Sequence, residues 1–113
     1  MIEYPTIPES IVIHLGPPDS DAENVTESFA DYIKNVASSE IYPTWPREAL
    51  IANILAQISV ALNRVYTGFY RNRGYDFDIT SSIANDQSYV YQRNIYSNIS
   101  ELVDEIFTSY LKR

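Results

Sequence analysis

Apolar positions along the chain fall into one short continuous run and several longer stretches with helical spacing. The run SIVIHL at residues 10–15 is rich in β-branched residues and predicts a strand. Apolar residues at intervals of three and four predict a first helix over residues 24–39, with Asn24 as its N-cap and Glu27 completing a capping box. Pro43 requires this helix to end before residue 42.

The longest periodic stretch covers about residues 46–71 and predicts a helix with a wide apolar arc, which we expect to be central and largely buried. Pro46 suits its first turn, and Gly74 is the expected stop. A last helix is predicted up to residue 111, opened by an N-x-x-E box of Asn98 and Glu101. Between these two helices, FDIT and SYVYQ predict short strands and SSIANDQ a loop.

These elements predict a mainly α fold with a few short β segments (α+β), in which three helices are arranged around the long central one. The length of 113 residues predicts a single domain over residues 1–113, and whether it is a fragment of a longer protein stays open. Residues 1–23, rich in proline, are expected to form an extended leader with a short strand.

Composition narrows the classes of function. The chain has no cysteine, which excludes a disulfide scaffold, a thiolate metal site and a Cys nucleophile. The net charge is −7, and its acidic front half argues against a nucleic-acid partner. No apolar stretch approaches the roughly 20 residues that span a bilayer, and the N-terminus lacks the features of a signal peptide. We expect no cofactor and no metal.

Few residues are candidates for chemistry by their type alone. The single histidine, His14, lies in the apolar strand and is expected to be a structural residue with a satisfied hydrogen bond. Three glycines cannot supply a phosphate loop. Of the ten tyrosines, Tyr66 and Tyr110 fall on helical apolar stripes and are expected in the core. Those near loops could stack on sugar rings, and the alternative, which we favour for any single one, is an amphipathic ring at the edge of the core.

Glu40 is the most informative carboxylate. It ends the first predicted helix and precedes the aromatic and proline-rich segment IYPTWP. The negative end of a helix dipole and burial beside rings both disfavour a carboxylate, so a raised pKa is expected. Such a group can donate a proton near neutral pH, and the alternative is an ordinary solvated glutamate.

The segment from residue 31 to 65 resembles the stage II sporulation protein D family, also called the amidase-enhancer domain family. That family reads approximately Tyr-Leu-x-Gly-Val-x-x-x-Glu-Met-Pro and then Trp-Pro-x-Glu-Ala-Leu, a pattern followed by Tyr32, Val36, Glu40, Pro43, Trp45, Pro46, Glu48, Ala49 and Leu50. A second block, Asp-Gln-x-Tyr before a helix, matches Asp86, Gln87 and Tyr89. The family's arginine falls on Ile58, and a glycine of the second block falls on Tyr91. The resemblance covers the N-terminal half of the family's domain.

The resemblance implies a domain directed at peptidoglycan, in the cell wall or spore envelope, although a cytoplasmic location is not excluded. It places a catalytic acid/base at Glu40. Asp86 and Gln87 would hydrogen-bond sugar or orient that acid, Tyr42 and Trp45 would offer stacking faces, and Tyr89 would line the same cleft. The partners implied are glycan strands and, for amidase-enhancer members, a cell-wall amidase. A shared site requires the Glu40 carboxylate within about 10 Å of the Asp86–Gln87 loop.

Two functions stay open from the sequence. One is cleavage of glycan strands as a lytic transglycosylase, with Glu40 as the general acid and base. The other is a peptidoglycan-binding or protein-interaction module without turnover, which the loss of the family's arginine at Ile58 favours. The preferred glycan and the oligomeric state are not predicted.

Overall fold

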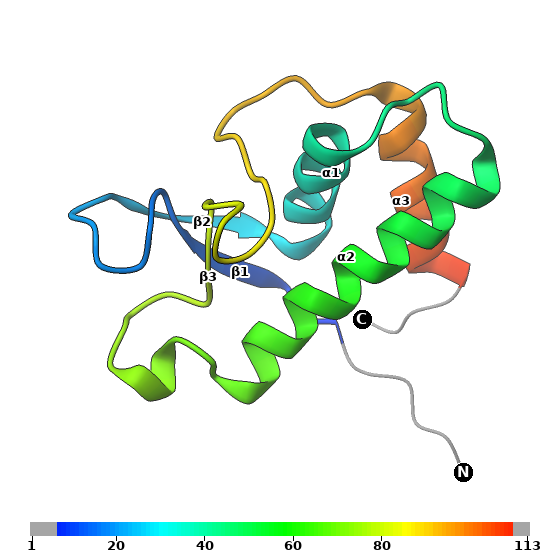
Figure 1. Ribbon diagram of the computed structural model, residues 1–113. Helices are drawn as coiled ribbons and strands as arrows, with labels where there is room; N and C mark the ends of the chain where they lie inside the picture. The colour runs from blue at the N-terminus through cyan, green and yellow to red at the C-terminus, as the bar shows by residue number, and fades with distance from the viewer. Residues whose placement is uncertain (1–6, 110–113) are drawn as a thin grey trace, which may run out of the picture.

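The computed structural model describes residues 7–109 (Figure 1). The elements, in chain order, are β1 (Ser10–His14), β2 (Asn24–Ser28), α1 (Phe29–Glu40), α2 (Arg47–Thr67), the 3-10 helix η1 (Arg71–Arg73), β3 (Ile79–Thr80) and α3 (Ser97–Ser109). Three helices with a small sheet confirm the expected mainly α, α+β fold.

The sheet is built around the strand that the sequence places in the Pro-rich leader. β1 lies at its centre, antiparallel to β2 on one side and parallel to the short β3 on the other. Ile13 of β1 is opposite Val25 of β2 and Ile79 of β3, and Ile11 and Ile13 are fully buried. The strand within this leader is therefore part of the hydrophobic core.

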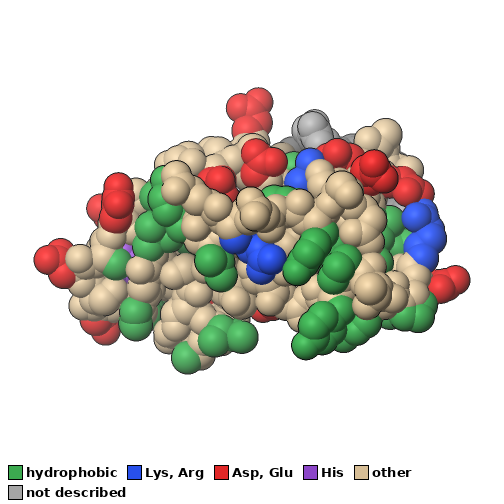
Figure 2. Space-filling view, turned by 90° about the horizontal axis from the view of Figure 1, so that it is seen from above, with side chains coloured by type: hydrophobic (Ala, Val, Ile, Leu, Met, Phe, Trp, Pro, Cys, Tyr) green, Lys and Arg blue, Asp and Glu red, His purple; other side chains and the backbone are tan. Residues whose placement is uncertain are grey.

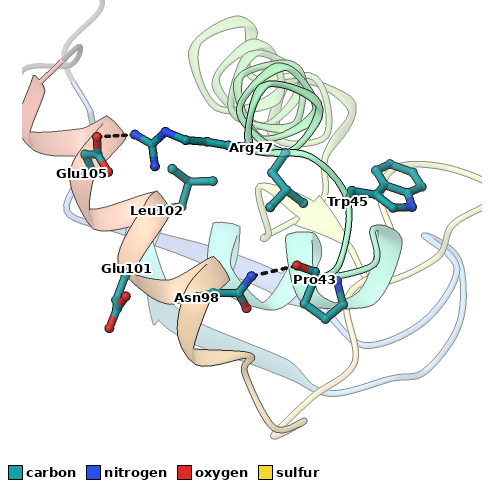
Figure 3. Close-up of a pocket in the computed structure, with 8 residues that line it drawn as sticks. Pro43, Trp45, Arg47, Asn98, Glu101, Leu102 and Glu105 are labelled. Atoms are coloured by element: carbon teal, nitrogen blue, oxygen red, sulfur yellow. Dashed lines mark hydrogen bonds and ion pairs between the residues drawn. The ribbon is translucent and has the colours of Figure 1, made fainter.

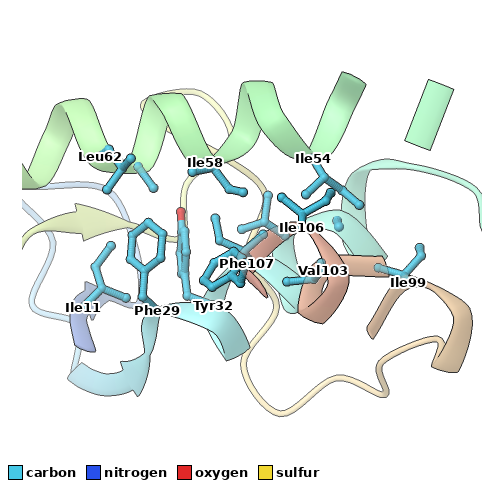
Figure 4. Close-up of a cluster of buried hydrophobic side chains, with 14 of the residues drawn as sticks. Ile11, Phe29, Tyr32, Ile54, Ile58, Leu62, Ile99, Val103, Ile106 and Phe107 are labelled. Atoms are coloured by element: carbon cyan, nitrogen blue, oxygen red, sulfur yellow. The ribbon is translucent and has the colours of Figure 1, made fainter. Parts of the chain in front are cut away.

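The core lies between α2 and a layer formed by α1, α3 and the sheet (Figure 4). α1 and α3 pack side by side, and α2 contacts both of them (Figure 1). α2 contributes Ile54, Ile58 and Leu62, which point into this core, with Leu62 on the side of Phe29 and Ile54 on the side of Ile106. The resulting burial of apolar surface is what holds three helices and a small sheet in one unit.

The first helix begins later than predicted. Residues 24–28 form β2, and Ser28 is the N-cap of α1, with its hydroxyl accepting a hydrogen bond from the Asp31 N–H at 3.1 Å. Pairing with β1 occupies the backbone of these residues, and this long-range pairing overrides the local capping signal. The Asn24 side chain bonds His14 and Asp76 instead, and the Glu27 carboxylate bonds a tyrosine hydroxyl.

α2 confirms the long helix but is shorter and less enclosed than expected. It ends at Gly68, whose φ of 61° supplies a left-handed cap, so Gly74 closes only η1. Leu55, Val60 and Tyr66 are exposed, and the prediction that Tyr66 lies in the core is wrong because its side chain is 57% exposed. Tyr110 lies outside the described residues.

By length and composition alone, α2 could cross a membrane, with a mean hydropathy of 1.3 over its apolar window. The length and hydropathy of α2 differ from the expectation that no apolar stretch approaches the length needed to span a bilayer. Only 33% of the window is buried within the fold, and that buried face packs against α1, α3 and β3. The core helix of a soluble domain has the same properties, so the finding by itself assigns no membrane role.

The C-terminal part of the chain differs from prediction in two details. The segment SYVYQ at residues 88–92 forms no strand and runs as a loop beside α1. α3 begins at Ser97, so Asn98 is inside the helix, and its amide donates to the Pro43 carbonyl at 2.9 Å. The predicted extension of this helix beyond residue 109 lies outside the described residues.

Candidate functional site

The Glu40 carboxylate is fixed at the surface by two donors from different parts of the chain. α1 ends at this residue, as predicted, and the residue is exposed. Oε1 accepts a hydrogen bond from Gln57 Nε2 of α2 at 3.1 Å, and Oε2 accepts one from the Ser88 main-chain N–H at 2.9 Å. The carboxylate thus touches the loop that follows Asp86 and Gln87, well within the distance expected for a shared site.

Asp86 is the buried anchor of that loop. Its side chain is 0% exposed. Oδ1 accepts from Arg64 Nε at 2.7 Å, while Oδ2 accepts from the Tyr70 hydroxyl at 2.6 Å and from the main chain and hydroxyl of Thr80 at 3.0 and 2.6 Å. Burial, followed by the bond to this carboxylate, raises the pKa of Tyr70 to about 12. The buried Asp86 side chain therefore stabilises the conformation of this loop.

Gln87 and Tyr89 also point inward. Gln87 donates to the Tyr32 hydroxyl at 3.2 Å, and the Tyr89 ring stacks on the Tyr32 ring with centroids 5.6 Å apart. The Tyr89 hydroxyl donates to the Glu27 carboxylate at 2.6 Å. Burial raises the pKa of both tyrosines. Gln87 and Tyr89 flank Ser88 in the sequence. Both of their side chains pack inward, and the main-chain N–H of Ser88 between them donates to the Glu40 carboxylate.

The two predicted stacking residues follow Glu40 in the exposed segment between α1 and α2. Tyr42 is 69% and Trp45 38% exposed, with ring centroids 6.0 Å apart. Trp45 lines a groove of about 320 Å³ where α2 and α3 begin (Figure 3). Arg47 and Glu105 form an ion pair across this groove, and Glu40 does not line it. Of the predicted binding residues, only these two offer exposed rings.

His14 has the structural role expected for it. Its Nδ1 lies 2.6 Å from Asn24 Oδ1 and its Nε2 lies 3.0 Å from the Ser20 carbonyl, and its ring stacks on Phe77. Within residues 7–109, no three His, Cys, Asp or Glu side chains are grouped so that they could hold a metal ion. The chemistry available at the site is that of a carboxyl group, an amide and a main-chain N–H.

Gln57 and Ser88 are the site residues that the sequence reasoning missed. Gln57 is a single amide within the apolar arc of the long helix, and a polar residue in that position is a signal for a specific partner. Ser88 contributes its backbone, which no side-chain pattern reveals. Its neighbours in the Asp-Gln-x-Tyr block indicated the loop that contacts Glu40.

The fold and the site define a small α+β domain in which one surface carboxyl group joins two helices and a loop. Residues 22–110 match the SpoIID family, described as Stage II sporulation protein. The chain belongs to this family, which confirms the resemblance and makes it a sporulation-related cell-wall domain. Comparisons with curated proteins and with solved structures found no match.

Proposed function

We propose that this domain binds peptidoglycan glycan strands at Glu40 and cleaves them as a lytic transglycosylase. The observation that supports this most is the exposed Glu40 carboxylate, which is oriented by Gln57 and Ser88 rather than neutralised by a cation. Among the described residues, no ion pair involves it. An oriented, accessible carboxyl group is what proton transfer to a bound sugar requires.

One carboxyl group is sufficient for this reaction. The protonated Glu40 donates its proton to the glycosidic oxygen as the bond from that oxygen to the sugar C1 breaks. The C6 hydroxyl oxygen of the same sugar then bonds to C1, and its proton returns to Glu40. The product carries a 1,6-anhydro ring, and no water is consumed, which explains why a second carboxylate is not needed to activate one.

Gln57 can accommodate both protonation states of Glu40. The carboxylate now accepts from the Gln57 amide nitrogen, while the amide oxygen is buried and has no hydrogen-bond partner in the described structure. Rotation of the amide by half a turn would present that oxygen to the carboxylic acid O–H. Because an amide carries both a donor and an acceptor, the same side chain can orient the acid and its conjugate base.

Replacement of the carboxyl group by an amide tests the proposal. We expect E40Q to form no anhydro-sugar ends from purified glycan strands, measured by mass spectrometry, while its far-UV circular dichroism is unchanged. E23Q is the matched control, because Glu23 is exposed in the turn before β2 and should retain full activity. Equal product from E40Q and E23Q would exclude Glu40 as the acid.

The second candidate function is glycan binding without turnover. It is favoured by the inward packing of Asp86, Gln87 and Tyr89, which leaves fewer polar side chains around Glu40 to position a substrate. In the same assay this alternative predicts retention of the chain on insoluble peptidoglycan without anhydro-sugar ends from either variant. A cell-wall amidase as a protein partner belongs to this alternative.

A further inference from the structure

The outward side of α2 differs from the outward sides of the other two helices. α1 exposes Asp31 and Glu40, and α3 exposes three acidic residues among others. In α2, residues 49–63 contain no charged residue, although charged residues make up 20% of the chain. An exposed, uncharged helix side is typical of a surface that meets another molecule. The exposed residues of this neutral stretch form what we call the outer strip: Ala52, Leu55, Ala56, Ser59, Val60 and Asn63.

The outer strip has the shape of a surface that packs against a helix. Its residues follow one another in steps of one, three or four, the spacing that forms holes for the side chains of a facing helix. Ala52, Ala56 and Ser59 are small, whereas the larger side chains of Leu55 and Val60 remain 37% and 39% exposed. The Ser59 hydroxyl donates to the Leu55 carbonyl at 3.0 Å, so it does not require a partner from outside the helix.

No element of the described structure covers the outer strip. α1, α3 and β3 pack against the opposite side of α2, where Ile54, Ile58 and Leu62 are buried, and Gln57, which bonds Glu40, is also on that buried side. In Figure 1, α2 runs across the molecule with no other element drawn over it. On the face shown in Figure 2, acidic side chains gather along the upper edge and hydrophobic ones along the lower edge, which is the side nearest the viewer in Figure 1. The strip is therefore accessible and separate from the Glu40 site.

The charge of the chain favours a second copy of itself as the occupant. Two copies with a net charge of −7 repel each other, and this repulsion is weakest where neutral surfaces meet. Glu48 precedes the neutral stretch, and Arg64, which is paired with Asp86, follows it. An antiparallel pair sets the Glu48 end of one helix beside the Arg64 end of the other and opposes the two helix dipoles, whereas a parallel pair brings like ends together.

We propose that two copies of the chain form a dimer through the outer strips of their α2 helices, which lie antiparallel about a twofold axis near Ala56. Ala56 is the midpoint of the neutral stretch, so Ala52 of each copy lies opposite Val60 of the other, and a small residue faces a larger one. A lipid bilayer fits the strip less well, because anionic headgroups repel an acidic chain and because Ser59 and Asn63 are polar.

The size of the outer strip sets the strength expected of this dimer. At about 1.5 Å per residue the neutral stretch is about 20 Å long, and with a helix width of about 10 Å it offers roughly 200 Å² of each copy. A standard protein–protein interface buries about 800 Å² of each partner. The dimer is therefore weak and in exchange with the monomer, and its population rises with the protein concentration.

Sedimentation equilibrium at increasing protein concentration tests the dimer. We expect the wild type to pass reversibly from monomer to dimer, and added salt to strengthen the association because it screens the repulsion between the copies. A56E places two carboxylates at the axis and should raise the Kd for dimerisation by about tenfold or more. T108E is the matched control, because it adds the same charge at an exposed position of α3, and it should associate as the wild type does. Far-UV circular dichroism should be unchanged in both variants.

Single cysteines test the orientation, because the chain has none of its own. We expect A56C to form a disulfide-linked dimer under mild oxidation, since the two copies of this position meet at the axis. A52C should form far less, because it faces residue 60 of the other copy. T108C is the control for random collision, and the yield of linked dimer is measured by non-reducing electrophoresis.

Three results would overturn the proposal. One is a wild type that stays monomeric at every concentration, and another is an A56E variant that associates as well as the wild type. Equal linkage of A52C and A56C would exclude the antiparallel arrangement. Binding of the monomeric wild type to phosphatidylcholine vesicles, lost in A56E, would assign the outer strip to lipid instead of a second copy.

Discussion

Two carboxylates near the same loop have opposite environments. Asp86 is fully enclosed and accepts four hydrogen bonds, one of them from a cationic guanidinium. Glu40 is exposed and accepts two, both from neutral donors. A buried carboxylate with all its acceptor positions filled can only support structure, whereas an exposed one held in a fixed orientation can still meet a ligand. The difference supports a structural role for Asp86 and is consistent with the role proposed for Glu40 in meeting a ligand.

The largest effect expected from this comparison is the loss of stability in D86N. The substitution leaves the Arg64 charge without its partner and places an amide nitrogen against donors, so we expect unfolding to become easier by about 3 kcal/mol. The measurement is the urea midpoint. E40Q is the matched control and should change stability by less than about 1 kcal/mol, because its contacts are exposed. Similar losses of stability in D86N and E40Q would contradict the difference drawn between the two carboxylates.

A pH titration examines the Asp86 cluster without removing its carboxylate. The pKa of Tyr70 is raised to about 12, from an ordinary value near 10. Between these values the unfolded chain releases the tyrosine proton and the folded chain keeps it, so stability is complete below pH 10 and falls as the pH rises toward 12.

Y70F should make this fall shallower, although Tyr32 and Tyr89, whose pKa values are also raised by burial, maintain part of it. The measurement is the urea midpoint at intervals from pH 9 to 12. An identical slope in wild type and Y70F would show that the Tyr70–Asp86 contact does not hold the proton.

Local pattern located most of the elements, including β3 within the segment FDIT, but it missed β2 and wrongly predicted a strand at residues 88–92. Helical spacing located α2, and β-branched residues located β1. The start of α1 was wrong because the pairing of β2 with β1 outweighs the capping signal at Asn24. Although β1 precedes the family match at residues 22–110, it is the centre of the sheet, so the sheet cannot be read from the matched segment alone.

The candidate site was also predicted only in part, because contacts between distant residues decide its details. The resemblance placed Glu40 and the Asp-Gln block together, and the contact between Glu40 and Ser88 agrees with that proximity. It could not specify that Asp86 and Gln87 point inward, because side-chain direction in an irregular loop depends on partners such as Arg64 and Tyr32 that lie far along the chain.

The smallest expected change in stability concerns Gln57, whose amide links Glu40 to α2. Leucine in its place removes a buried oxygen without a hydrogen-bond partner, so Q57L should alter stability by no more than about 0.5 kcal/mol or increase it slightly. Glycan cleavage should nevertheless fall about tenfold, because Glu40 loses one of its two orienting contacts. If Q57L keeps both its stability and its glycan cleavage, Gln57 does not orient Glu40.

The most direct test of the Glu40 site is a nuclear magnetic resonance titration of the ¹⁵N-labelled chain with peptide-free glycan strands. We predict that the Ser88 main-chain amide and the Gln57 side-chain amide shift in a saturable way, and that E40Q reduces both shifts. Saturable shifts confined to the groove around Trp45 and Asn98, with Ser88 and Gln57 unmoved, would contradict the account.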